Sequence, residues 1–191
     1  EELLGEQQRS TVSVIAAETD RELNERMKWL ESVAERITPA MLDKPVVLQE
    51  FLAQRLILQS LFNGGGVVHR RDGTAVADSL PASGRIGVNY MDVETVATTL
   101  NEGRSTIGRA VIGKKLGAPV FGMTAPIRDA RGKVIGALAG VTNLGLPNFL
   151  DQFVQNGYGK TGGYVVVARQ LRRIIAASDK KRVMEAAPAP G

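Results

Sequence analysis

One glycine-rich stretch, GYGKTGG at residues 157–163, contains the Gly-Lys-Thr triplet that closes a phosphate-binding loop. Such a loop needs a further glycine five positions earlier, and it must follow a strand and open a helix. Here that position is Val154, helically spaced apolar residues precede the stretch, and the strand-like run Tyr164–Ala168 follows it. Because this order is reversed, we predict that the glycines end a helix and turn the chain into a strand, and that Lys160 and Thr161 are turn residues.

The composition offers few residues for nucleophilic or metal-dependent catalysis. The chain has no cysteine, so disulfides and thiolate metal sites are excluded. Its single histidine, His69, lies beside Arg70 and Arg71. A Ser-His-Asp triad would have to use it, and a zinc site would have at most one imidazole. We expect His69 to be a solvated strand residue. We also expect no enzymatic activity, no catalytic residue, no metal site and no cofactor.

The net charge of the 191 residues is +4, and the basic residues are scattered in short pairs. Nucleic-acid binding would need a basic stripe interleaved with aromatic residues, and aromatics make up only 5% of the chain. No nucleic-acid partner is therefore expected. No apolar run approaches the roughly 20 residues of a membrane span. The start at Glu1-Glu2, with no signal-peptide pattern, indicates a segment of a longer protein.

The elements that must position any site fall into a helical part and a strand-rich part. Apolar residues recur at intervals of three and four in residues 1–37, which predicts one long helix ending before Pro39. A second helix is predicted at 46–61, with Asp43 as its N-terminal cap. At Asn63 the sequence changes to glycine-rich turns and strand-like segments, which predicts a sheet.

Turn residues predict how these strands pair. One hairpin is expected between 67 and 78 around an Asp-Gly turn, and another between 119 and 142 around the turn Asp-Ala-Arg-Gly. A helix at 92–101 and a strand at 106–112 are expected between the two hairpins. A third hairpin at 163–177 is similar to the first, which indicates either a tandem repeat of two sheet modules or a chance similarity.

Four blocks follow one another along the strand-rich part: VVHRRDGTAVADS, GVNYMDVETVATTL, PVFGMTAPIRDARGKVIGALAGVTNL and TGGYVVVARQLRRIIAASDKKR. Together with the two preceding helices, their order resembles the double Cache domain, the extracytoplasmic sensor of bacterial transmembrane signalling proteins. The third block is similar to the family's proline-containing strand, Asp–Gly turn and G-x-L-x-G strand. The fourth block resembles the beginning of the family's second, membrane-proximal module. The resemblance covers nearly the whole chain.

The resemblance implies an α+β fold, with a long N-terminal helix, a PAS-like antiparallel sheet module and the start of a second, truncated module. The expected parts are the two helices at 1–62, the membrane-distal module at 63–156 and the beginning of the membrane-proximal module at 157–191. The resemblance also implies that the chain is a small-molecule sensor in the periplasmic portion of an inner-membrane protein. Such a sensor would relay binding through the N-terminal helix to a cytoplasmic output domain.

The end of the chain, SDKKRVMEAAPAPG, resembles endings in proteins whose output is a diguanylate cyclase or a phosphodiesterase. The resemblance thus implies a cyclic-di-GMP output domain outside this chain. Two alternatives stay open. The chain is otherwise a chemoreceptor or histidine-kinase sensor domain, or it is a dimerisation module that binds no ligand and forms a homodimer through its N-terminal helix.

The implied ligand site lies between the sheet and the segment 90–101. Arg109, within the strand expected at 106–112, would suit a carboxylate, so a small organic acid is the expected ligand. Family members that bind amino acids carry an arginine and an aromatic pair after the Tyr90 position, and an aspartate in the last strand. Here these places hold Met91–Val96 and Val141. Because a buried amino group needs an anionic partner, an amino acid is not expected as the ligand.

The candidate ligand-binding residues are all expected beside this pocket, and each could instead have a structural role without contact to a ligand. Arg109 is otherwise a solvated surface residue, and the apolar candidates are otherwise part of the core. The candidates are Tyr90, Arg109, Phe121, Met123, Val141 and Asn143.

Overall fold

The computed structural model describes residues 2–154, and these fall into two compact units. One unit holds residues 2–25 and 149–154, with most of helix α1 (Glu2–Ala34) and the short helix α6 (Asp151–Val154). The other unit, Arg26–Asn148, holds the end of α1 and all the remaining elements. The GYGKTGG stretch, the third hairpin and the second module expected at 157–191 lie outside the described residues.

Helix α1 confirms the long N-terminal helix predicted from the apolar spacing. Leu23, Leu30 and Ala34 lie on the predicted apolar stripe and are buried, whereas Trp29 lies off the stripe and is 51% exposed. No helix within residues 2–154 has both the length and the apolar character needed to cross a membrane.

The second predicted helix is interrupted at Arg55, which divides it into α3 (Pro45–Gln54) and α4 (Leu56–Leu61). The ψ of Arg55 is 75°, outside the helical range. Asp43 is not the N-terminal cap that we expected, because it ends the preceding short helix α2 (Pro39–Leu42), and Lys44 precedes α3. The prediction of two helices thus missed the short helix α2 and the break at Arg55.

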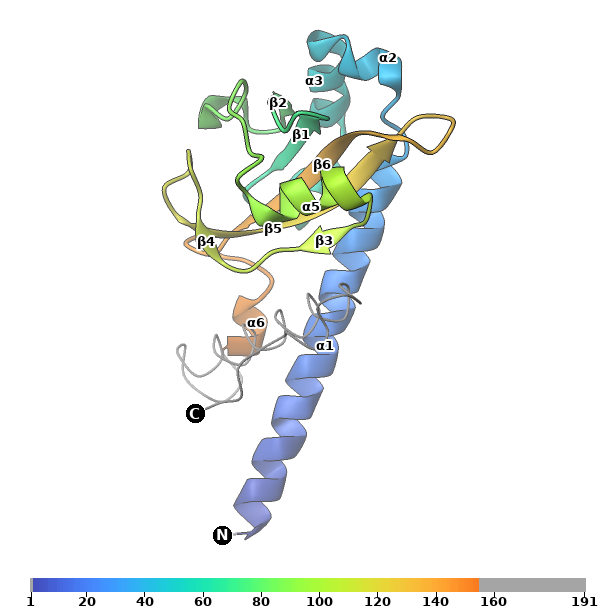
Figure 1. The fold of residues 1–191 in the computed structure, drawn as a ribbon. Coiled ribbons are helices and arrows are strands. Elements are labelled where there is room, and N and C mark those ends of the chain that lie inside the picture. The colour runs from blue at the N-terminus through green and yellow to red at the C-terminus, as the bar shows by residue number, and fades with distance from the viewer. Residues whose placement is uncertain (1, 155–191) are drawn as a thin grey trace. The chain divides into compact units, whose positions relative to one another are not determined.

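A six-stranded antiparallel sheet forms the centre of the second unit (Figure 1). The strand order is β2-β1-β6-β5-β3, and β4 pairs with another part of β5. The neighbours β1–β2 and β5–β6 are the two hairpins predicted from the sequence. The bounds are β1 (Gly66–Arg70), β2 (Ala75–Asp78), β3 (Thr106–Ile107), β4 (Val111–Ile112), β5 (Pro119–Arg128) and β6 (Val134–Asn143).

Local turn chemistry explains why the hairpins were predictable. In the first turn, the Asp72 carboxylate accepts a hydrogen bond of 2.9 Å from the Thr74 amide, and Gly73 has a positive φ of 89°. In the second, the Asp129 carboxylate accepts hydrogen bonds from the amides of Arg131 and Lys133, both at 2.9 Å. These contacts involve only neighbouring residues, so they can be read from the sequence.

The strand predicted at 106–112 is two short strands, and the intervening Arg109 belongs to neither. Gly108 passes so close to helix α5 (Glu94–Glu102) that an added Cβ would lie 2.8 Å from a methyl carbon of Thr95. The amide of Gly108 still donates to the Gly122 carbonyl at 2.7 Å, and pairing with β5 resumes at Val111. The place of Arg109 within a strand was therefore predicted wrongly.

Different helices cover the two faces of the sheet. Helix α5 lies across β5 and β6 on one face (Figure 1). On the opposite face, a Cβ at Gly140 would lie 2.6 Å from the Phe62 ring, so the end of α4 packs directly on β6. Met123 is the cross-strand partner of Gly140 and shares this second face. Because side chains alternate between the two faces, a site on the α5 face must use the residues of β5 and β6 that directly precede and follow Met123 and Gly140.

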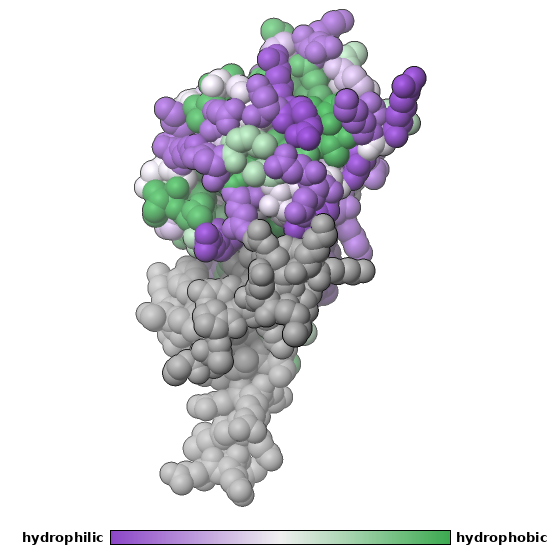
Figure 2. All heavy atoms as spheres, viewed as in Figure 1, coloured by the Kyte–Doolittle hydropathy of each residue, from purple (hydrophilic) through white to green (hydrophobic). Residues whose placement is uncertain are grey.

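Most of the described surface visible in Figure 2 is hydrophilic, and its hydrophobic side chains lie in small patches. One such patch lies over β4, where Val111 and Ile112 are exposed. These two side chains also border the cavity described below.

Candidate functional site

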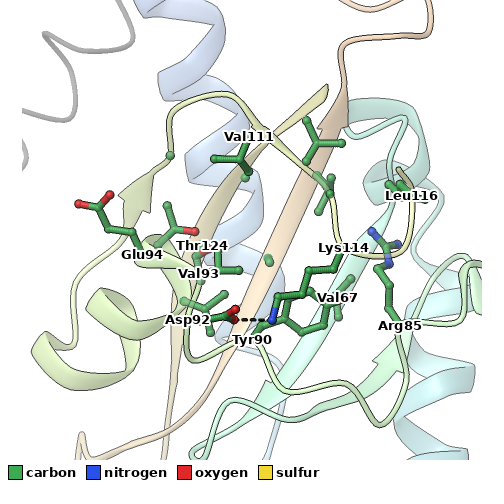
Figure 3. Close-up of a pocket in the computed structure, with 18 of the residues that line it drawn as sticks. Val67, Arg85, Tyr90, Asp92, Val93, Glu94, Val111, Lys114, Leu116 and Thr124 are labelled. Atoms are coloured by element: carbon green, nitrogen blue, oxygen red, sulfur yellow. Dashed lines mark hydrogen bonds and ion pairs between the residues drawn. The ribbon is translucent and has the colours of Figure 1, made fainter. Parts of the chain in front are cut away.

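A cavity of about 350 Å³ lies on the α5 face of the sheet (Figure 3). Its floor comes from β1, β5 and β6, with Val67, Thr124 and Ala139 in one cross-strand row. One wall is the segment that leads into α5, and the other is the β4 segment, residues 108–116. Gly122 opens the floor further, because even an added Cβ would have no neighbour closer than 3.7 Å.

His69 is part of this floor and is not the solvated residue that we expected, since only 2% of it is exposed. The expectation was wrong because β1 is an inner strand, paired with β2 on one side and β6 on the other. The His69 ring meets the Tyr90 ring edge to face, with centroids 5.3 Å apart. Burial, and after it the positive charge of Arg85, lowers the pKa of His69 to about 4, so the imidazole is neutral near pH 7.

A buried ion pair holds Arg85 at the cavity. Its Nε and Nη2 donate to the two carboxylate oxygens of Asp78, each at 2.7 Å. The Ser83 hydroxyl and the Leu80 amide donate to the same carboxylate at 2.6 and 2.8 Å. Both charged side chains are at most 5% exposed. The guanidinium of Arg85 thus reaches the cavity with its charge already balanced by Asp78.

The rim of the cavity carries exposed charges of both signs. Lys114 extends over the Tyr90 ring, 5.3 Å from its centroid, and donates to the Asp92 carboxylate and the Asn89 carbonyl (Figure 3). The hydrogen bond from Lys114 lowers the pKa of Asp92. Arg109 and Glu94 form a second, looser pair at 3.9 Å, with side chains 76% and 55% exposed. Both pairs connect the β4 segment to the start of α5.

Three cavity-lining residues carry a buried polar atom without a hydrogen-bond partner. These atoms are His69 Nδ1, Tyr90 Oη and Thr124 Oγ1. Burial raises the pKa of Tyr90, so its hydroxyl keeps its proton near pH 7 and can donate. Buried polar groups are usually paired, so each such atom indicates hydrogen-bonding capacity that the described residues leave unused.

The structure brings three of the six predicted site residues to the cavity: Tyr90, Arg109 and Val141. Phe121 and Met123 are fully buried on the opposite face of the sheet and do not line it. Asn143 stands at the end of β6, where its backbone amide donates to Asn63 Oδ1 at 2.6 Å and its own Oδ1 accepts from Gly145 at 2.9 Å. Whether any of the six contacts a ligand stays a prediction.

The other lining residues were not among the candidates, and those with polar or charged side chains include His69, Arg85, Asp92, Glu94, Lys114 and Thr124. Asp92 is the first residue of the helix predicted at 92–101, and Thr124 projects to the face of β5 opposite to the candidate Met123. The alternation along β5 would have placed Thr124 at the cavity once the buried side of Met123 was known. No local pattern marks Arg85, because its burial depends on Asp78 and on the loop that joins them.

A family model described as Cache domain matches residues 1–186. No curated relative of the chain was found. The fold is similar to the ligand-binding domain of the Pseudomonas fluorescens chemoreceptor CtaA in complex with L-serine. That likeness has a TM-score of 0.63 and 19% identity, and it covers 75% of this chain and 61% of the other.

Two further structures have the same fold. The ligand-binding domain of the Pseudomonas aeruginosa chemoreceptor PctB, in complex with L-Arg, gives a TM-score of 0.61 at 19% identity, covering 80% of this chain and 55% of the other. The sensor domain of the Vibrio cholerae histidine kinase DctB gives a TM-score of 0.59 at 13% identity, and the likeness covers 75% of this chain and 57% of the other. This chain thus covers less than two thirds of the length of each of these three domains.

The expectation that the ligand is not an amino acid is contradicted by these similar domains, two of which hold amino acids. The expectation rested on Met91–Val96, which lack the family's arginine and aromatic pair, and on Val141, which stands where an aspartate would meet the ligand amine. The cavity shows why this reason was insufficient. Asp92 and Glu94 line the same cavity and supply anionic groups from a different wall.

Proposed function

We propose, since this chain belongs to the Cache domain family, that its cavity binds a free amino acid as an extracytoplasmic signal. Cache domains are ligand-binding sensor domains of membrane receptors and are not catalytic. The observation that carries the proposal is one cavity of about 350 Å³ whose rim presents carboxylates and cations together. A zwitterionic ligand needs both kinds of partner within a few ångströms.

Charges at the rim suit the two ends of a zwitterion. Asp92 and Glu94 offer carboxylates to an ammonium group, while Lys114 and Arg109 offer cations to a carboxylate. Tyr90 adds an aromatic face beside Lys114, whose Nζ lies 5.3 Å from the ring centroid. The volume stands at the low end of small-molecule pockets, about 300–1,000 Å³, which favours a single amino acid over a nucleotide.

Thermal melting in the presence of single ligands tests this function. The common L-amino acids are compared with dicarboxylic acids and purines at matched concentrations. A ligand at about 100 times its Kd stabilises the folded state by about 2.7 kcal/mol. For a chain of this length that raises Tm by roughly 5–10 °C. No shift with any amino acid at millimolar concentration contradicts the proposal, and a shift with dicarboxylates or purines alone redirects it to another ligand.

Gly122→Ala supplies the matched variant for this measurement. The added methyl group narrows the cavity floor but meets no atom closer than 3.7 Å, so the fold should tolerate it. We expect Gly122→Ala to melt near the wild-type temperature without ligand and to lose most of the shift with ligand. Equal shifts in both proteins would place the ligand outside the cavity.

For the whole protein, we propose a periplasmic sensor that signals through α1 to a cytoplasmic output domain that makes or degrades cyclic-di-GMP. The resemblance of the sequence at the end of the chain supports this output. The similar chemoreceptor and histidine-kinase domains support the alternative outputs. Cellular cyclic-di-GMP, measured with and without the amino acid in cells expressing the full-length protein, separates them. An unchanged level argues for a chemoreceptor or kinase output.

A further inference from the structure

Floor and rim of the cavity differ in charge. The rim side chains are exposed and ionised, and they include Asp92, Lys114 and Arg109. The floor is buried and consists of apolar groups, neutral hydrogen-bonding groups and one ion pair. Its residues are Val67, His69, Arg85, Val120, Thr124 and Ala139.

No unbalanced charge faces the ligand from this floor. Arg85 is bound by two hydrogen bonds to Asp78, and His69 is uncharged near neutral pH. A charged ligand group placed there would lose its hydration without gaining an unpaired opposite charge. The floor therefore disfavours the carboxylate of an acidic side chain and the cation of a basic one.

A purely apolar ligand group is also a poor match for the floor. Two floor atoms, His69 Nδ1 and Thr124 Oγ1, are buried and lack hydrogen-bond partners, and so does Tyr90 Oη, whose ring meets that of His69. Thr124 is fully buried and His69 nearly so, which leaves bulk water little access to them. An aliphatic side chain would leave all three atoms unpaired, whereas a hydroxyl or carboxamide can both donate and accept.

We propose that the floor selects amino acids whose side chain is neutral and hydrogen-bonding, a hydroxyl or a carboxamide. This inference rests on the proposed amino-acid function and names the ligand class within it. The zwitterionic head stays at the charged rim, and the ligand side chain enters the floor. Thr124, Tyr90 and His69 then act as specificity-determining residues.

Calorimetric titration of the whole chain with matched ligands tests the selection. The pairs are L-serine with L-alanine, L-threonine with L-valine, and L-glutamine with L-methionine. L-glutamine against L-glutamate tests the exclusion of charge. We expect the polar member of the tightest-binding pair to bind at least about tenfold better than its apolar match, and L-glutamine to bind at least about tenfold better than L-glutamate.

The chain offers a matched pair of variants. Thr124→Val removes the hydroxyl at the floor, and Thr142→Val removes another buried, unpartnered threonine hydroxyl that does not line the cavity. We expect Thr124→Val to lower the polar-to-apolar preference by about tenfold, and Thr142→Val to leave it at the wild-type value. Tyr90→Phe provides a second variant with the same expected direction if Thr124→Val fails to fold.

The outcomes separate this inference from the function on which it rests. If no amino acid binds, both fail. If amino acids bind but the apolar or charged member binds as well as the neutral polar one, the selection is refuted and the function stands. Equal preferences in Thr124→Val and Thr142→Val, or an unchanged preference in Tyr90→Phe, likewise refute the selection alone.

Discussion

At the scale of single residues, burial controls the charge state of His69 and so links stability to pH. Its pKa is about 4 in the folded chain, against 6.5 for an exposed histidine. Between these values the unfolded chain binds more protons than the folded one, so stability falls as pH falls from about 6.5 to about 4. The shift corresponds to about 3 kcal/mol.

Chemical denaturation at several pH values, with wild type and His69→Gln in parallel, measures this contribution. Carboxylates titrate in both proteins, so the difference between the two stability curves isolates the imidazole. We expect the wild-type curve to fall more steeply between about pH 6.5 and 4. Parallel curves would show that His69 titrates normally in the folded chain.

The Arg85–Asp78 pair gives a second prediction at this scale. Arg85→Met leaves the Asp78 carboxylate buried with only the Ser83 hydroxyl and the Leu80 amide as side-chain and loop partners. Breaking a buried pair by removing one partner costs about 3–5 kcal/mol of unfolding free energy. Urea denaturation measures the loss.

Arg109→Met is the control for that measurement. Its partner Glu94 lies 3.9 Å away, and both side chains are largely exposed. Surface pairs contribute about 0–1 kcal/mol, so little change is expected. Similar losses in the two variants would mean that the geometry and burial of the Arg85 pair add nothing to stability.

At the scale of elements, the packing of α4 against β6 depends on one glycine. A Cβ at Gly140 would lie within 2.6–2.7 Å of three ring carbons of Phe62, which is fully buried. Because the ring is enclosed, Gly140→Ala should force it aside and cost about 1–3 kcal/mol. Thermal or chemical unfolding checks this, with Gly122→Ala on the opposite face as the tolerated comparison. A neutral Gly140→Ala would mean that Phe62 has room to move.

Local chemistry decided which elements could be predicted. The two hairpins follow from Asp72-Gly73 and from Asp129 with its neighbours, all within a few residues of each turn. The breaks at Arg55 and Arg109 have no such local signal. The second break occurs where α5 crowds Gly108, a contact between segments that are separate in the sequence.

At the scale of the whole molecule, the difference between local contacts and contacts of distant segments explains how much of the candidate site could be predicted. Tyr90 was placed correctly beside the cavity because it leads directly into the predicted helix. His69 and Arg85 were missed because their burial requires β1 to become an inner strand and the loop after β2 to fold back on Asp78. Such long-range packing is fixed only when the sheet is complete.

The division into two units leads to a prediction about autonomous folding. The sheet, the helices on both of its faces and every cavity-lining residue belong to Arg26–Asn148. We expect residues 26–148 alone to unfold cooperatively and to bind the same amino acid as the full chain, with an affinity within about threefold. Circular dichroism melting and calorimetry measure both properties.

A shorter chain, residues 35–148, is the matched control for that experiment. It lacks the end of α1, where Leu30 and Val33 are buried and Arg26 Nε donates to the Leu61 carbonyl at 3.3 Å. Each lost apolar side chain removes about 1.5–3 kcal/mol, so this chain should be largely unfolded. If residues 26–148 also fail to fold, the second unit depends on the residues outside it. If residues 35–148 fold as stably as 26–148, the end of α1 is dispensable to the sheet that carries the cavity.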